Sequence, residues 1–136
     1  MRATMTVIGV SVMLLAACRV GPRIETFEPA TRAAGTQATL RFQIDRQTFT
    51  RSGELIAVRA EDFLILTERG IESVPHDVLD GAEFQDAKPG RIRGAGRDRD
   101  RRDIARYSRY PLGLTEAQLG ALMQALGQAA LIEVER

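Results

Sequence analysis

A strict alternation of apolar and polar residues near position 40 is the feature that most constrains the fold of this chain. Ala38, Leu40, Phe42 and Ile44 alternate with Thr39, Arg41, Gln43 and Asp45. Successive side chains of a β-strand point to opposite faces, so this period of two predicts a strand with one buried and one solvated face. The region therefore belongs to a sheet that has one apolar side.

Four further short segments read as strands, because each is apolar and each is bounded by turn residues. We expect them over residues 53–60, 62–68, 71–74 and 82–85. Pro75 ends the fourth, since proline cannot donate a ladder hydrogen bond, and 75–78 forms a short helical turn. Five short strands joined by tight turns predict a small, strongly bent β-barrel over residues 36–87.

The order of these segments resembles the Sm-like and SH3-like small barrels. Two features differ from that pattern: no helix precedes the first strand, and Ile92-Arg93-Gly94 follows the fifth strand instead of lying in the fourth. The resemblance therefore implies a fold class and carries no RNA binding. The expected fold is mainly β, a five-stranded SH3-like or Sm-like barrel with one or two C-terminal helices.

The C-terminal part reads as a Gly/Arg-rich loop over 88–103 and a helical extension over 104–136. Ile104 and Tyr107 fall at helical spacing, so 98–109 is either a solvated helix or loop. Thr115 and Gln118 fit a capping box. After this cap, an apolar stripe at helical spacing comprises Leu119, Leu122, Met123 and Leu126. The stripe either packs in the core or forms a docking surface for a partner. Residues 131–135 form a terminal strand or one more helical turn.

The N-terminus carries a second resemblance. Arg2 precedes an apolar run over 7–17, which is shorter than the roughly 20 residues needed to span a bilayer. Leu15-Ala16-Ala17-Cys18 at its end resembles the lipobox of bacterial lipoproteins. The resemblance implies that 1–17 is a cleaved signal peptide, that Cys18 carries lipid, and that 18–35 is a flexible tether. Cys18 is the only cysteine, so no disulfide forms within one chain.

The same resemblance implies a location in the cell envelope. Arg19 follows the cysteine, where aspartate would retain a lipoprotein in the inner membrane. We therefore expect the periplasmic face of the outer membrane, with the inner membrane as the alternative. Nucleic acid is not an expected partner, because 19 basic and 18 acidic residues nearly balance.

The sequence offers no catalytic constellation and no cofactor motif. His76 is the single histidine, and it lies in a turn beside Asp77. Ser73 is close in sequence, but it lies on a strand running into the same turn, so we interpret His76 as a surface turn residue. Asp98, Asp100 and Asp103 alternate with arginines that neutralise them, so we expect a solvated charged face and no metal site.

The arginines of the 91–109 segment are the candidates for contact with phosphates: Arg91, Arg93, Arg97, Arg99, Arg101 and Arg102. The sequence favours a non-enzymatic binding or structural module that presents strand edges to an envelope protein partner. The first alternative is a membrane-surface module that binds anionic lipid or glycolipid. A small hydrolase is the least favoured of the three functions. The oligomeric state stays open.

Overall fold

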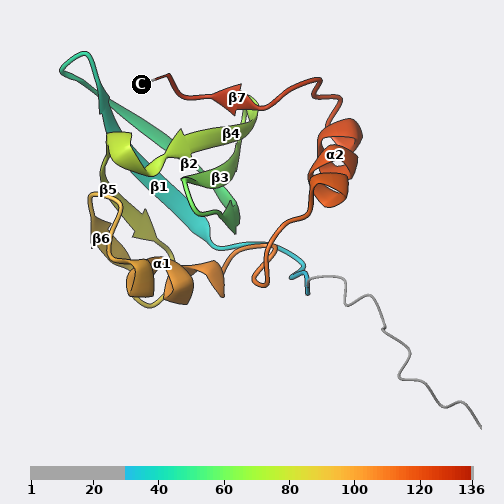
Figure 1. Ribbon diagram of the computed structural model, residues 1–136, viewed down its shortest axis with the longest axis horizontal. Coiled ribbons are helices and arrows are strands. Elements are labelled where there is room, and N and C mark those ends of the chain that lie inside the picture. The colour runs from blue at the N-terminus through green and yellow to red at the C-terminus, as the bar shows by residue number, and fades with distance from the viewer. Residues whose placement is uncertain (1–29, 136) are drawn as a thin grey trace, which may run out of the picture.

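The computed structural model describes residues 30–135, so the expected signal peptide, Cys18 and Arg19 lie outside the described residues. The strands are Gln37–Ile44 (β1), Gln47–Val58 (β2), Asp62–Thr67 (β3), Gly70–Pro75 (β4), Leu79–Phe84 (β5), Arg91–Arg93 (β6) and Ile132–Glu133 (β7). A 3-10 turn, His76–Val78 (η1), joins β4 to β5, and the two α-helices are Asp98–Ala105 (α1) and Glu116–Ala125 (α2). The described chain is therefore mainly β with two helices (Figure 1).

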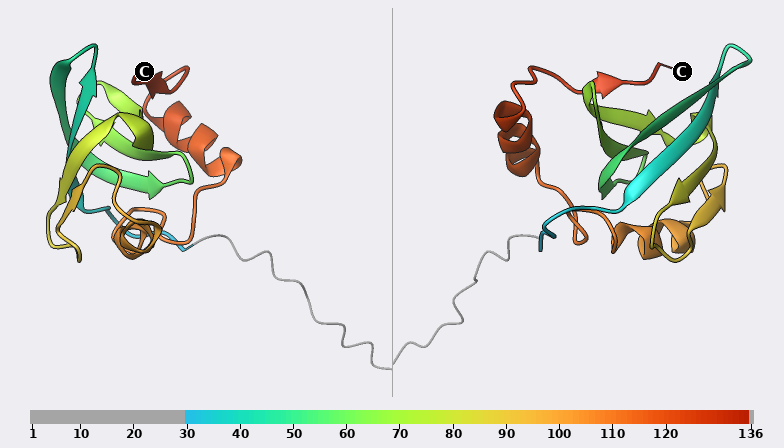
Figure 2. Two further views of the ribbon diagram at one scale, coloured as in Figure 1. Left: turned by 60° about the vertical axis from the view of Figure 1, so that its left-hand side comes forward. Right: turned by 180° about the vertical axis from the view of Figure 1, so that it is seen from behind.

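The expected closed five-stranded barrel is wrong. The strands form one open, strongly curled sheet of seven, in the order β6-β5-β1-β2-β3-β4-β7 (Figures 1 and 2). Closing a barrel from the central five would need β5 to pair with β4. Instead β6 pairs with the free edge of β5, and β7 pairs in parallel with β4. Both edges are occupied by strands from the C-terminal part, so the sheet stays open.

The first hairpin is longer than expected. Its two-residue turn places Asp45 and Arg46 at positive φ, as a tight hairpin turn requires. β2 therefore begins at Gln47, where we expected a loop before residue 53, and it pairs with the whole of β1. The polar stretch 47–52 is a strand because β1 supplies its hydrogen-bond partners, which its own composition does not reveal.

The concave face of the sheet holds the main core. Alternate residues of β1 point inward, as the sequence predicts, and they meet the inward side chains of β2 to β6 and of α1. This cluster comprises Ala38, Leu40, Phe42, Leu55, Phe63, Ile65, Val74, Leu79, Ala82, Phe84, Ala87, Ile92, Ile104 and Val134. Glu72 is also fully buried on this side, where it accepts hydrogen bonds from Arg51 and Thr67. β3 lies between β2 and β4 and is buried on both of its faces, as its apolar sequence predicts for an inner strand.

The convex face is covered over only part of its area. α2 lies against β2, β3 and β4 there (Figure 2). Leu119 is buried in this second cluster and Leu122 and Met123 pack against it, whereas Leu126 is 45% exposed, so the leucine stripe is core except at its end. Thr115 and Gln118 form the expected capping box. Neither helix of the described residues lies over the convex face of β1, β5 and β6.

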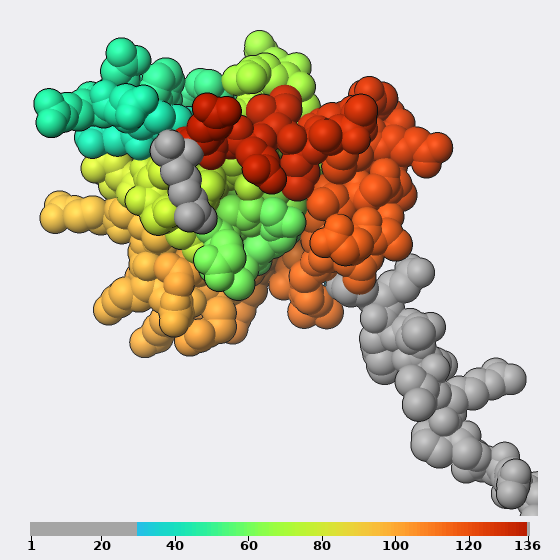
Figure 3. Space-filling model, turned by 45° about the horizontal axis from the view of Figure 1, so that its top comes forward, coloured from blue at the N-terminus to red at the C-terminus, as the bar shows by residue number. Residues whose placement is uncertain are grey.

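Two C-terminal segments resolve the alternatives that the sequence left open. Residues 98–105 are helical, and Ile104 is fully buried. Residues 132–133 form β7, and the C-terminal segment crosses the molecule beside the first hairpin (Figure 3). The expected 88–103 loop is corrected as well, because β6 and the start of α1 fall within it.

The end of the expected tether is docked onto the domain. The amide of Arg32 donates to the Arg109 carbonyl, and the amide of Gly35 donates to Glu54. A Cβ on Gly35 would lie 1.9 Å from the Leu55 carbonyl oxygen, so only glycine fits this close approach. The segment between residues 32 and 35 is therefore part of the folded unit and not a free linker.

Candidate functional site

The uncovered convex face of β1, β5 and β6 carries two rows of polar side chains. In the first row Thr50, Arg41, Gly81 and Arg93 lie directly across from one another on β2, β1, β5 and β6. The second row places Ser52, Thr39, Glu83 and Arg91 in the same order. The register of four strands thus brings together residues from four separate parts of the sequence.

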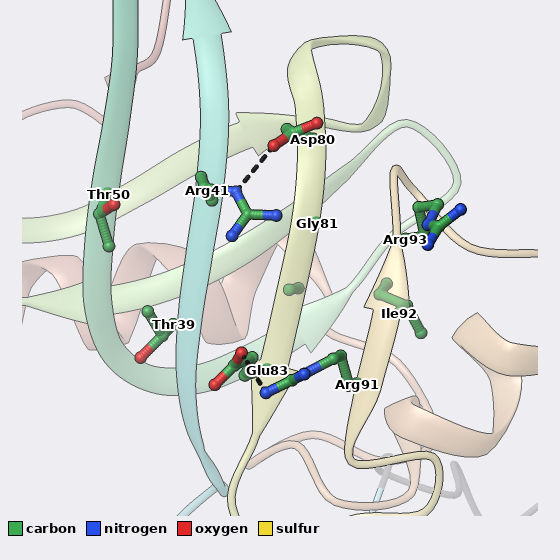
Figure 4. A pocket seen from close by; sticks show the side chains of 10 residues that line it. Thr39, Arg41, Thr50, Asp80, Gly81, Glu83, Arg91, Ile92 and Arg93 are labelled. Atoms are coloured by element: carbon green, nitrogen blue, oxygen red, sulfur yellow. Dashed lines mark hydrogen bonds and ion pairs between the residues drawn. The ribbon is translucent and has the colours of Figure 1, made fainter.

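A β-bulge shapes the first row. Between the Arg41–Gly81 and Phe42–Leu79 pairs β5 contains one extra residue, Asp80. Bulges of this kind turn a side chain in a new direction. Here the Asp80 carboxylate lies 2.7 Å from Nε of Arg41 and accepts a hydrogen bond from it (Figure 4).

Gly81 leaves a hollow under the Arg41 guanidinium. A Cβ at this position would lie 3.3 Å from Nη2 of Arg41 and 3.2 Å from the Ile92 carbonyl oxygen. The hollow is part of a groove of about 530 Å³. That volume falls within the 300–1,000 Å³ that is usual for small-molecule sites.

The charges of the groove do not cancel. Its lining includes Arg41, Arg91 and Arg93 against two carboxylates, Asp80 and Glu83, which leaves one net positive charge. Arg91 points along the row to Glu83, with 2.7 Å between Nη2 and Oε1 (Figure 4). Among the described residues no side-chain partner is found for Arg93. The groove therefore contains two guanidinium groups that pair with carboxylates of β5 and, among the described residues, one without a side-chain partner.

The six arginines predicted for anionic contact do not form one surface. Arg91 and Arg93 lie in the groove, whereas the other four belong to α1 and its N-terminal end. Each of three pairs with an aspartate of the same helix: Arg97 with Asp100, Arg99 with Asp103 and Arg101 with Asp98. Arg102 lines a separate hollow between α1 and the end of β2.

Arg41, Asp80 and Gly81 were missed by the sequence analysis. Arg41 was assigned only to the solvated face of its strand, and its partner Asp80 is 39 residues away. The local signal was an arginine on a polar face and a glycine within a strand, which often marks a close backbone approach. Their meeting depends on the β1–β5 register, which no local pattern encodes.

His76 does not join a catalytic group. Its ring packs against Phe63 with 4.8 Å between centroids, and its Nε2 is buried without a hydrogen-bond partner. Burial and the nearby charge of Arg101 lower the pKa of His76. The hydroxyl of Ser73 donates to Asp62 and not to His76. The expected surface position is therefore corrected: His76 is half-buried against the core.

The aspartates of α1 are bound to arginines, as described above. Within residues 30–135 no group of three or more His, Cys, Asp or Glu side chains is arranged to hold a metal ion. Neither helix in this part of the chain has the length and apolar character needed to cross a membrane.

Comparison of the chain with protein-family models, with curated proteins and with solved structures finds no match.

Proposed function

We propose that this chain is a lipid-anchored, non-enzymatic binding module of the bacterial cell envelope, and that it binds through the uncovered face of β1, β5 and β6. The anchor is supported by Leu15-Ala16-Ala17-Cys18 and the short apolar run before it. The binding face is supported by one observation: Arg41 is held by Asp80 over the Gly81 hollow. A guanidinium fixed in this way suits recognition better than a freely rotating one, because less entropy is lost on binding.

The structure favours this face over the strand edges that the sequence analysis proposed for partner binding. The edge strands β6 and β7 have three and two residues. The β4 edge is also occupied next to β7, because the Gln128 side chain donates to the Ile71 carbonyl and accepts from the Ile71 amide. Short and occupied edges give a partner strand few hydrogen bonds, so strand addition is disfavoured.

The membrane-surface alternative has weaker support. It needs the arginines of 91–109 to face an anionic surface together, and the structure divides them between the groove and α1. On α1 the aspartates neutralise three of the four. An anionic membrane gains little from arginines that are already paired.

The anchor is tested by the mass of the N-terminal peptide of the protein extracted from membranes. We expect a chain that begins at Cys18 and carries diacylglycerol, and we expect Cys18→Ser to leave the membrane fraction. An unmodified Cys18 in a protein that stays soluble would refute the anchor.

The binding face is tested in cells with a photo-cross-linking amino acid placed at Thr50, which lines the groove. The matched control is Gln124 on the exposed side of α2. We expect a specific cross-linked species from position 50 only. The same species from both positions, or none from position 50, would contradict the proposal.

A further inference from the structure

The geometry points to the ligand class of this groove: we propose that it binds an oxyanion, the phosphate or carboxylate group of a small molecule, between Arg41 and Arg93 above Gly81. The inference rests on the proposed function, because it concerns the same face. It names the chemistry that the face recognises and the residues that recognise it.

Arg41 provides a positioned donor. Its Nε is occupied by Asp80, while the described residues provide no hydrogen-bond acceptor for its two Nη groups. The side chain is 54% exposed, so the Nη groups are open to a ligand. In Figure 4 the guanidinium extends from β1 toward Gly81. Two adjacent N–H donors with fixed orientation match the paired oxygens of a carboxylate or phosphate.

Arg93 provides the second cation on the opposite side of the same glycine. It pairs across the strands with Gly81, which in turn pairs with Arg41. Two strand spacings, or roughly 10 Å, separate the backbones of the two arginines. Figure 4 shows the Arg93 side chain on the outer side of β6, so it turns toward Gly81 to share a ligand with Arg41. A Cβ at position 81 would lie 3.3 Å from Nη2 of Arg41, so a side chain there would crowd the Arg41 guanidinium.

The remaining lining fits a ligand with one negative charge and further polar groups. The net charge of the groove is positive by one, so an oxyanion neutralises it. Arg91 is tied to Glu83 and keeps that carboxylate from repelling the ligand. Thr39 and Thr50 line the same groove. The Thr39 hydroxyl shares a hydrogen bond with that of Ser52, and a hydroxyl can both donate and accept, so each threonine can still contact the body of the ligand.

The test titrates the full chain carrying Cys18→Ser with each probe. Binding is measured by calorimetry and by the NMR signals of the arginine Nε groups. The probes are inorganic phosphate, glucose 6-phosphate, glucuronate and, as the uncharged control, glucose. We expect the anions to bind, with Nε shifts at Arg41 and Arg93, and glucose to have no effect. Tighter binding of glucose 6-phosphate identifies phosphate as the group recognised, and tighter binding of glucuronate identifies carboxylate.

Matched variants separate a built site from diffuse charge. Arg41→Gln and Arg93→Gln should each weaken binding by about tenfold or more, since each removes charge-assisted hydrogen bonds. Arg99→Gln removes the same charge from α1, on a side chain that is 83% exposed, and should change affinity less than about twofold. Gly81→Ala should weaken binding without removing charge.

Two results would overturn the proposal: no anion binds, or Arg99→Gln weakens binding as much as Arg41→Gln does. Circular dichroism of each variant confirms that it folds, so a loss of binding is assigned to the groove. Because the titration uses an unlipidated chain, its outcome is independent of the anchor. A failed anchor test with intact anion binding would refute only the lipoprotein proposal, and the reverse result would refute only the oxyanion site.

Discussion

The two halves of the convex face belong to one sheet and differ in almost every respect. Over the second half of β2 and over β3 and β4 most outward side chains are apolar, and α2 packs on Ile56, Leu64 and Ile71. Over β1, β5, β6 and the first half of β2 the outward side chains are mainly polar or charged, and no helix within residues 30–135 covers them. We call these the covered half and the bare half.

The difference follows from the cost of exposing apolar surface. Leaving Leu64 and its neighbours in water would cost about 25 cal/mol for each Å² exposed, so the covered half needs a helix. The bare half is solvated as it stands, and two of its arginines, Arg41 and Arg91, pair with carboxylates of β5. A sheet can therefore use one convex area for stability and another for recognition.

Ion pairs also differ between the halves. In the covered half Asp62 is buried and bonded to both Arg59 and Ser73, whereas the carboxylates of the bare half are about half exposed. Buried pairs strongly affect stability when one partner is lost, while exposed pairs contribute little. The following changes test this comparison.

Truncation of the apolar surface under α2 should have the largest effect. Leu64→Ala removes a fully buried side chain, and we expect the free energy of unfolding to fall by about 2–5 kcal/mol. Urea unfolding followed by circular dichroism measures it. Thr50→Ala in the bare half is the control, with an expected change within about 0.5 kcal/mol. Equal effects at the two positions would refute the division into halves.

Loss of the buried carboxylate should have an intermediate effect. Burial alone raises the pKa of Asp62, but hydrogen bonds from Arg59 and Ser73 outweigh it and hold the pKa below its usual range. We expect Asp62→Asn to cost about 1.5–3 kcal/mol at neutral pH. Asp80→Asn, its exposed counterpart, should cost less than about 1 kcal/mol.

The same residue predicts a pH dependence. A lowered folded-state pKa means that the stabilisation from Asp62 is complete above its unfolded pKa of about 3.9 and is lost as the pH falls below it. Wild-type stability should therefore drop in acid more steeply than that of Asp62→Asn. Urea midpoints measured between neutral pH and the acid limit of folding give this slope. Parallel curves for the two proteins would argue against the pairing.

The smallest effect is expected for the exposed pair in the bare half. A double-mutant cycle with Arg91→Gln and Glu83→Gln should give a coupling free energy of about 0.2–1 kcal/mol that shrinks at high salt. Thermal unfolding at low and high ionic strength measures it. A larger, salt-independent coupling would mean that this pair, like Asp62, supports the fold.

Local patterns predicted the elements that have strong periodicity or a clear cap. The alternation in β1 gave its buried face correctly, and Thr115 marked the start of α2. The patterns failed where a strand is polar or very short. Residues 47–52, β6 and β7 are strands because β1, β5 and β4, respectively, supply their hydrogen-bond partners. The mistaken barrel follows from missing β6 and from not pairing the terminal strand with β4.

The candidate site was predicted only in part. Arg91 and Arg93 were singled out because they lie in an arginine-rich segment, and they do line the groove. The same composition also pointed to Arg97, Arg99 and Arg101, which pair with aspartates on their own helix. Arginine content gives the charge of a segment, while the direction of each side chain depends on the element that carries it.

The sequence by itself determined the β character of the domain, the inward face of its first strand and the cap of its last helix. These depend on the side-chain period and on contacts between residues close in the chain. Only the tertiary structure decided that the sheet stays open, that α2 covers one half of its convex face, and that Arg41 and Arg93 flank Gly81. Those outcomes depend on the register between strands such as β1 and β5, whose paired residues lie about 40 positions apart, and register is set by the packing of the whole core.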